Sequence, residues 1–209
     1  MPDPLPNPVF DPAAMYRPLR CGIRIENPAI NEVGTLGFLA TDQGKTFLVS
    51  CRHVLQGCDQ GPTPGIFQPA LDPANLVSTG PPRIGVHDCA AVEVPPTVLC
   101  VGGVDLNLGA IKGTAPLQAG MAVHKCGATT GITEGEVRVI QSEFLVAPPP
   151  GAPPLYLVTD TGDSGALFLD SATNNAVALC RGARVVGGRT WAVIVPIADV
   201  LGELGIQFL

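Results

Sequence analysis

Three side chains that could together catalyse acyl transfer occur along the chain in the order His53, Asp88 and Ser164. A serine hydroxyl is a poor nucleophile near neutral pH. It needs a neutral imidazole to take its proton and a carboxylate to hold that imidazole in the right tautomer. The sequence therefore offers Ser164 as a candidate nucleophile, His53 as a candidate base and Asp88 as a candidate orienting acid.

The candidate nucleophile lies in the segment Gly162-Asp163-Ser164-Gly165. Glycine at position 162 allows a backbone conformation that turns the amides of Gly162 and Ser164 toward a developing oxyanion. A Gly-x-Ser-Gly string also arises by chance, so an ordinary turn serine in a glycine-rich loop is the alternative reading of Ser164. The catalytic reading therefore depends on the other residues.

Alternatives exist for the base and the acid. His53 directly follows an apolar segment, whereas His87 and His124 are expected to be ordinary residues. Asp88 could be a turn acid, and Asp105 is its rival as the orienting carboxylate. The apolar run after Asp88 suits a buried carboxylate and favours it.

Other hydrolase arrangements fit poorly. An α/β-hydrolase needs Gly-x-Ser-x-Gly and a later histidine, but residue 166 is alanine and no histidine follows Ser164. The subtilisin order needs an aspartate before the histidine and a parallel sheet with helices. A Cys51 nucleophile would lie only two residues from His53 on one strand, which gives poor geometry for attack.

Composition favours short strands joined by tight turns. The 209 residues include 25 glycines and 22 prolines, 46% of the residues are hydrophobic and 14% are charged. These values predict an all-β protein. The net charge of −6, with no basic run, argues against a nucleic-acid partner. No apolar run is long enough to span a bilayer, so no membrane association is expected.

The cysteines indicate thiols in a reducing compartment. Seven cysteines are present, an odd number, and no secretory signal is visible, so we expect a cytoplasmic protein without a disulfide framework. No Cys-x-x-Cys pair occurs and only three histidines are present. The sequence therefore predicts no metal site and no cofactor.

The pattern divides the chain into an arm and two halves. Residues 1–17 form a proline-rich arm that we expect to be extended or disordered. Residues 18–113 are predicted to hold the first set of strands, and residues 114–209 the second set with a helix over Ile197–Leu204. The proline-rich segment 148–154 is interpreted as a hairpin tip. Predicted strands lie near residues 22–26, 34–40, 45–50, 83–86, 90–94, 98–111, 121–125, 136–140, 144–147, 155–158, 166–169, 176–180 and 191–195.

Seven segments in this order resemble the trypsin-like, chymotrypsin-fold serine peptidases, especially compact bacterial-type members without disulfides. The resemblance covers about residues 20–209 and implies two six-stranded antiparallel β-barrels packed side by side. It assigns the catalytic roles to His53, Asp88 and Ser164, and the oxyanion donors to the amides of Gly162 and Ser164. The matching segments are Gly34–Gly37, Val49–Leu55, Asp88–Val92, Val123–Gly127, Thr129–Gly131, Gly162–Gly165 and Trp191–Ile197.

The resemblance also implies a pocket for the side chain before the scissile bond. One wall would include Val158, Thr159 and Asp160, and the other Cys180, Arg181 and Gly182, whose backbone could pair with an extended substrate. Val158 at the charge-selecting position predicts a small or medium apolar preference, whereas Asp160 could favour a basic side chain instead.

Near its start, the sequence has no Ile-Val-Gly-Gly-like segment that zymogen cleavage could free. The sequence therefore does not show which group pairs with Asp163. The sequence thus predicts a serine endopeptidase that acts on peptides or proteins without zymogen cleavage. A catalytically silent relative that binds a peptide or protein partner in the cleft is the alternative. The oligomeric state is not predicted.

Overall fold

The computed structural model describes residue 11 and residues 14–209. Most of the predicted N-terminal arm therefore lies outside the described residues. At its described end, the Tyr16 amide and the Arg17 guanidinium donate hydrogen bonds to Gln68 Oε1 at 2.9 and 2.7 Å. These contacts hold the start of the ordered chain against the loop that follows β6 (Ile66–Phe67).

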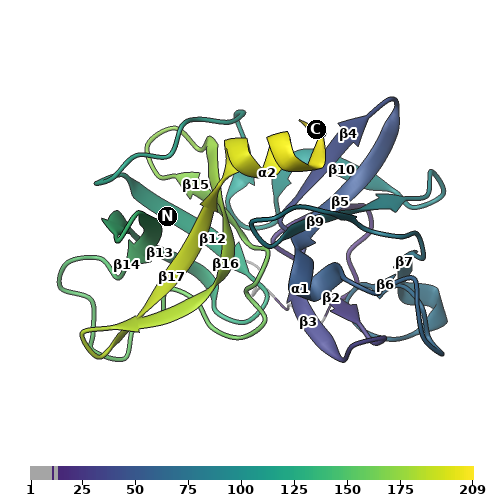
Figure 1. Cartoon of the computed structure of the whole chain (residues 1–209), viewed down its shortest axis with the longest axis horizontal. Coiled ribbons are helices and arrows are strands. Elements are labelled where there is room, and N and C mark those ends of the chain that lie inside the picture. The colour runs from purple at the N-terminus through teal and green to yellow at the C-terminus, as the bar shows by residue number, and fades with distance from the viewer. Residues whose placement is uncertain (1–10, 12–13) are drawn as a thin grey trace, which may run out of the picture.

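Two β-rich halves lie side by side in the molecule (Figure 1). The second half is a closed six-stranded barrel with the strand order β12-β13-β14-β17-β16-β15. Its interior is filled by apolar side chains such as Val123, Val146 and Phe168, which are fully buried. The barrel strands are β12 (Ala122–Gly127), β13 (Gly131–Ile140), β14 (Glu143–Ala147), β15 (Leu167–Asp170), β16 (Ala176–Val186) and β17 (Arg189–Pro196).

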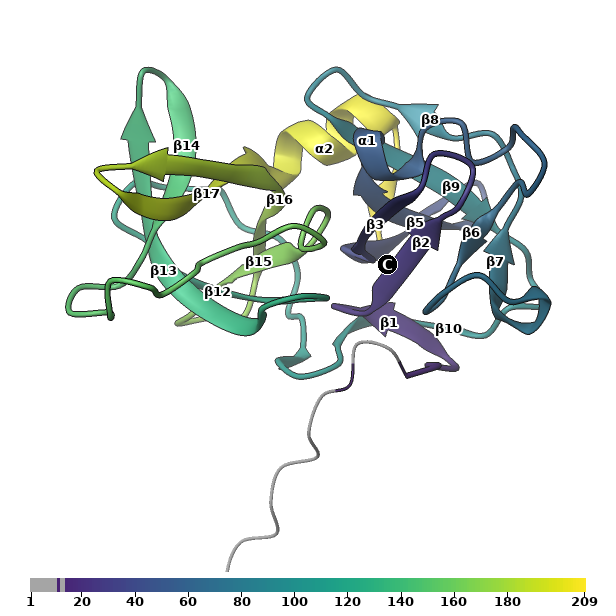
Figure 2. The same cartoon turned by 90° about the horizontal axis from the view of Figure 1, so that it is seen from below.

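The first half consists of three sheets around one apolar core. The sheet orders are β1-β10-β11, β18-β4-β5-β9-β8 and β3-β2-β6-β7, and Figure 2 shows these sheets beside the closed barrel. The remaining strands are β1 (Leu19–Cys21), β2 (Arg24–Asn27), β3 (Glu32–Thr35), β4 (Phe38–Asp42), β5 (Lys45–Cys51), β7 (Leu76–Ser78), β8 (Arg83–Ile84), β9 (Cys89–Val94), β10 (Cys100–Asp105), β11 (Gly109–Ala110) and β18 (Gln207–Phe208).

The predicted all-β class and double-barrel architecture are confirmed, although the first barrel is less regular than the second. The hairpin β4–β5 closes through Gln43 and Gly44, which both have positive φ, as a two-residue turn with left-handed residues requires. This turn sets the register of β5, which runs directly into His53.

Two helices accompany the strands, besides a 3₁₀ turn η1 (Pro73–Asn75). The predicted C-terminal helix is present as α2 (Ile197–Leu204), and Gly205 ends it in the left-handed conformation. The other helix, α1 (Arg52–Leu55), is one turn long, too short to give a periodic signal. Within the described residues, no helix has both the length and the apolar character needed to cross a bilayer.

Two local predictions are wrong. The segment 155–158 is loop instead of strand, because Pro153 and Pro154 precede it and the Tyr156 amide bonds Pro153 O in a turn. The proline-rich segment 148–154 therefore opens a long loop between β14 and β15 and is not a hairpin tip.

The predicted division of the chain into two halves near residue 114 stays a prediction. One segment of the second half pairs with the first half. After α2 the chain returns to the first half, where β18 pairs with β4 and the Phe208 ring stacks on Phe38 at a centroid distance of 5.1 Å. The last residues thus tie the two halves together.

Candidate active site

His53 and Asp88 meet because of the register between two adjacent strands. Cys51 at the end of β5 lies directly opposite Cys89 at the start of β9. His53, two residues after Cys51, and Asp88, one residue before Cys89, therefore emerge at the same sheet edge. Asp88 has a φ of 62°, a left-handed conformation that aspartate tolerates better than most residues.

The two side chains form a direct pair. His53 Nδ1 lies 2.8 Å from Asp88 Oδ2, and the His53 backbone amide donates to Asp88 Oδ1 at 3.0 Å. Burial raises the pKa of Asp88, but the hydrogen bonds and charge of His53, with Arg52, outweigh it and hold this pKa below its ordinary value. An ionised Asp88 can accept a hydrogen bond from the Nδ1–H group, which would leave Nε2 of His53 without a proton and able to act as a base.

Ser164 faces the same cavity as His53. Both residues line a cavity of about 150 Å³, together with Gly162 and Gly182. Among the described residues, neither Ser164 Oγ nor His53 Nε2 has a hydrogen-bond partner, so neither atom is occupied by another group of the protein. Hydrogen bonds of this type often tighten only when substrate is bound.

The peptide between Thr161 and Gly162 is held by a hydrogen bond to Thr129. Thr129 Oγ1 donates to Thr161 O at 2.6 Å, and Thr129 is not among the residues that line the cavity. A planar trans peptide directs its N–H opposite to its C=O, so the Gly162 amide is directed away from Thr129 Oγ1. Gly162 has a φ of 97°, and a Cβ there would collide with Thr129 Oγ1, so only glycine fits.

The rest of the turn is held from the first half. Thr35 Oγ1 donates to Gly162 O at 2.9 Å, and the Thr35 amide donates to Ser164 O at 2.8 Å. Within the described part of the chain, the amides of Gly162 and Ser164 have no hydrogen-bond partner. Two such unpaired amides, flanked by fixed carbonyls, could donate hydrogen bonds to an oxyanion.

Asp163, whose partner the sequence left open, is bound to Lys125. Both side chains are fully buried, and Lys125 Nζ lies 3.0 Å from Asp163 Oδ2. Thr130 Oγ1 and the amides of Thr129, Thr130 and Asp160 also donate to this carboxylate, at 2.6 to 3.1 Å. Burial raises the pKa of Asp163, but Lys125 and these donors outweigh it and hold the pKa below its ordinary value.

Sequence reasoning missed Lys125, although one signal was present. Along β12, Val123 and Lys125 are two residues apart and therefore face the same side, the buried interior of the barrel. A charged residue on a buried face needs a charged partner. Asp163 is that partner.

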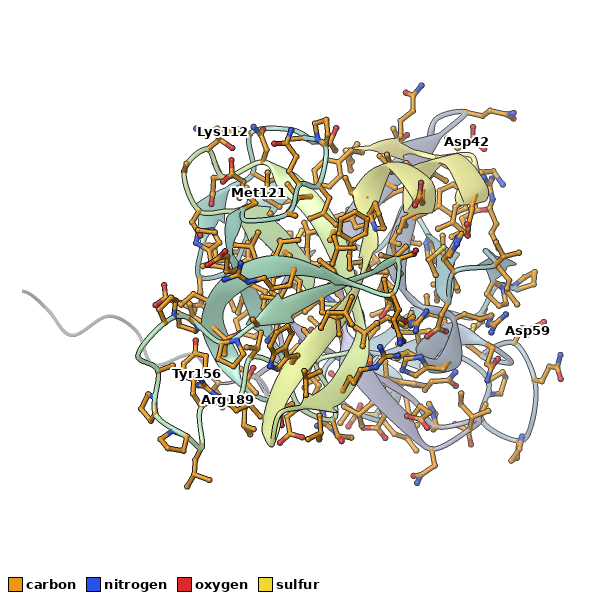
Figure 3. All side chains as sticks on the ribbon, turned by 60° about the vertical axis from the view of Figure 1, so that its left-hand side comes forward. Asp42, Asp59, Lys112, Met121, Tyr156 and Arg189 are labelled. Atoms are coloured by element: carbon orange, nitrogen blue, oxygen red, sulfur yellow. The ribbon has the colours of Figure 1, made fainter. Side chains whose placement is uncertain are left out.

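We expect Lys125→Met to lower the free energy of unfolding by about 3 kcal/mol, because the Asp163 carboxylate would stay buried without its cation. Chemical denaturation at pH 7 measures this change. Lys112→Met is the matched control, since Lys112 is exposed (Figure 3). A loss no larger for Lys125→Met than for Lys112→Met would contradict the prediction.

Of the residues predicted to bind substrate, only some reach the cavity. Asp160 and Gly182 line it. Val158, Thr159 and Cys180 are buried, and the Thr159 hydroxyl lies 3.3 Å from Cys180 Sγ. Arg181 is turned toward Glu143, at 2.9 Å.

The rival acid Asp105 lies elsewhere. Its side chain is buried and accepts hydrogen bonds from the amides of Asn107 and Leu108, both at 3.0 Å. Burial raises the pKa of Asp105 to about 6, although these amides lower it. His87 and His124 also have other partners, Glu203 and Asn174.

The raised pKa of Asp105 predicts a pH-dependent stability. Between the unfolded pKa of 3.8 and about pH 6, the unfolded chain releases this proton while the folded chain keeps it, so stability falls as pH rises. Asp105→Asn removes the effect. We expect the variant to gain about 2–3 kcal/mol relative to the parent between about pH 4 and pH 7, measured by denaturation at each pH. A constant difference would contradict this.

Within the part of the chain that the structure describes, one group of side chains could hold a metal ion. Ligand atoms of Cys51, His53 and Asp88 lie within 4.8 Å of one another. The Cys51 thiol donates to Cys180 O at 3.1 Å, and burial raises its pKa well above the ordinary value. Metal binding would need the thiolate and would break the His53–Asp88 hydrogen bond, so this geometry favours the hydrogen-bonded pair.

Comparison with solved structures identifies the fold. No protein-family profile matches the sequence, and no curated protein is similar to it in sequence. Among solved structures, Thermobifida fusca Protease A is similar, with a TM-score of 0.64, 17% identity, and coverage of 91% of this chain and 97% of that chain. A serine protease specific for glutamic acid gives a TM-score of 0.65 at 20% identity over 91% and 100% of the two chains. Cellulomonas bogoriensis chymotrypsin gives a TM-score of 0.59 at 19% identity, with coverage of 91% of this chain and 97% of that chain. The chain therefore has the chymotrypsin fold of the bacterial serine proteases.

Proposed function

We propose that the chain is a serine endopeptidase that hydrolyses peptide bonds through a covalent acyl-enzyme. The observation that carries the proposal is one cavity that combines His53, bound to Asp88, with Ser164 and the unpaired amides of Gly162 and Ser164. These are a base with its orienting acid, a nucleophile and an oxyanion site. Peptides or proteins are the proposed substrates.

The proposed reaction uses only these groups. Ser164 Oγ attacks the carbonyl carbon while His53 Nε2 takes its proton, and the two amides bind the oxyanion. The protonated His53 then gives its proton to the leaving amine, and the C–N bond breaks. Water, deprotonated by His53, attacks the acyl-enzyme ester and regenerates Ser164. Asp88 holds His53 in the required tautomer throughout.

Activity without zymogen cleavage is part of the proposal. The Lys125–Asp163 pair supports it, because an internal cation already binds the carboxylate next to Ser164. A freed N-terminal amine is then not needed to shape the oxyanion turn. A cytoplasmic location is also proposed. All seven cysteines are free, and six are buried, as expected for thiols in a reducing compartment.

A silent domain that binds a peptide or protein partner in the cleft is the second candidate. The absence of a hydrogen bond between Ser164 Oγ and His53 Nε2 favours it. Reaction with a fluorophosphonate separates the two candidates, because only an activated serine forms the phosphonyl ester. We expect mass spectrometry to locate one adduct, on Ser164. An intact chain that forms no adduct would support the silent domain.

A further inference from the structure

The cavity at Ser164 carries negative charge contributed by both halves of the molecule. Asp160 lines it from the second half, with Thr161 and Gly182, and Glu32 lines it from the first half, with Val33. Among the described residues that line this cavity, none is a lysine or an arginine. A substrate that fills it therefore meets two carboxylates, and the only basic side chain there is His53.

Neither carboxylate is neutralised by a described residue. Within the described ranges, the Glu32 side chain has no hydrogen bond or ion pair, and Asp160 Oδ1 accepts only the Thr161 amide, at 2.8 Å. Two nearby arginines are held by another acid, Glu143. Arg181 lies 2.9 Å and Arg184 2.6 Å from Glu143. Glu32 and Asp160 thus remain available to a cation brought by the substrate.

The positions of the two acids relative to the reacting atoms are fixed by the backbone. Asp160 belongs to the oxyanion turn, because the Asp163 amide donates to Asp160 O at 3.0 Å. Glu32 begins β3, whose next residue Val33 would lie 3.8 Å from a Cβ on Gly162. Thr35, at the end of β3, binds Ser164 O at 2.8 Å. Both acids therefore lie on segments that form or contact the turn at Ser164.

The chemistry of the leaving group assigns each acid to one side of the scissile bond. His53 must protonate the leaving amine. The part of the substrate that carries this amine therefore lies beside the first half of the molecule, with Glu32 and Val33. The acyl half then lies toward Asp160, Thr161 and Gly182. Val158, the expected charge-selecting position, is buried in the barrel core and leaves Asp160 as the acid on this side.

We propose that the enzyme prefers peptides with a basic side chain on each side of the scissile bond. This inference rests on the proposed function. Asp160 binds the basic side chain on the amino side, and Glu32 binds the one on the carboxyl side. Each is a positioning contact at the rim and not part of the bond-breaking machinery. An exposed ion pair contributes up to about 1 kcal/mol, so each contact should change kcat/KM about fivefold.

Four internally quenched peptides test the proposal. They share one sequence and differ only at the two residues flanking the scissile bond, which are lysine or its uncharged analogue norleucine in all four combinations. At low ionic strength, we expect kcat/KM for the Lys-Lys peptide to exceed that for the doubly uncharged peptide by about 25-fold if the two contacts act independently. In about 1 M salt the ratio should shrink, because the Debye length is then about 3 Å.

Three variants, each of which removes one negative charge, test which residue causes the lysine preference on each side of the scissile bond. Asp160→Asn should remove the lysine preference only on the amino side, and Glu32→Gln only on the carboxyl side. Asp59→Asn is the control, since Asp59 is exposed and lies at the periphery of the first half (Figure 3). It should leave both preferences intact. Cleavage of the doubly uncharged peptide by Asp59→Asn should match cleavage by the parent.

The outcomes separate this inference from the proposed function. Equal cleavage of the four peptides, or preferences that survive both Asp160→Asn and Glu32→Gln, would overturn the dibasic preference alone. A chain that forms the Ser164 adduct but cleaves none of the peptides would also overturn it alone. A chain that neither forms the adduct nor cleaves any peptide would overturn both proposals.

Discussion

Replacing Ser164 with alanine is expected to lower kcat by on the order of 10⁶-fold and to abolish the fluorophosphonate adduct. The methyl group cannot form the ester, so the chain loses covalent catalysis. Binding and the oxyanion amides would account for the small activity that remains. The measurement is peptide cleavage under single-turnover conditions, together with intact-mass analysis after reaction with the probe.

The fold should survive this change. Ser164 contributes its backbone carbonyl to the Thr35 amide, and alanine keeps that bond. Far-UV circular dichroism and the denaturation midpoint should match the parent. Ser50→Ala is a control for loss of a serine hydroxyl, since Ser50 Oγ donates to Thr35 O but lies outside the reacting groups. Full labelling of Ser164→Ala would remove Ser164 from the mechanism.

The second large effect is expected for Asp88→Asn, which should lower kcat by about 10⁴-fold. Asparagine has the same shape, and its carbonyl oxygen can still accept the His53 amide. Its NH₂ group, however, cannot accept the Nδ1 proton. His53 would then carry its proton on Nε2, where it cannot act as a base toward Ser164. Steady-state cleavage near neutral pH measures the loss.

Asp105→Asn is the matched control for this experiment, because Asp105 was the rival acid. It should leave kcat unchanged, since Asp105 hydrogen-bonds the amides of Asn107 and Leu108 and not His53. The reverse pattern, with a large loss only for Asp105→Asn, would transfer the orienting role away from Asp88.

Much of the fold followed from sequence because local pattern and tertiary structure agree. Alternating apolar residues predicted the central strands, and the spacing of Ile197, Val200 and Leu204 predicted α2, whose buried face packs on the core. The wrong strand at 155–158 shows the limit of such patterns. Four apolar or aromatic residues in a row fit a strand, but the preceding prolines and the neighbouring loop contacts decide their conformation.

The chain by itself determined which residues could do chemistry. The order of His53, Asp88 and Ser164, and the glycine at 162, are properties of the sequence. Only the tertiary structure decided which groups meet, because those contacts join segments far apart in the chain. Lys125 binds Asp163 across 38 positions, and Thr35 holds the Gly162 carbonyl across 127. Periodicity reports which face of its own strand a side chain occupies, but not which strand lies opposite. The shape of the oxyanion turn and the two acids at its rim therefore became visible only when both halves of the fold came together.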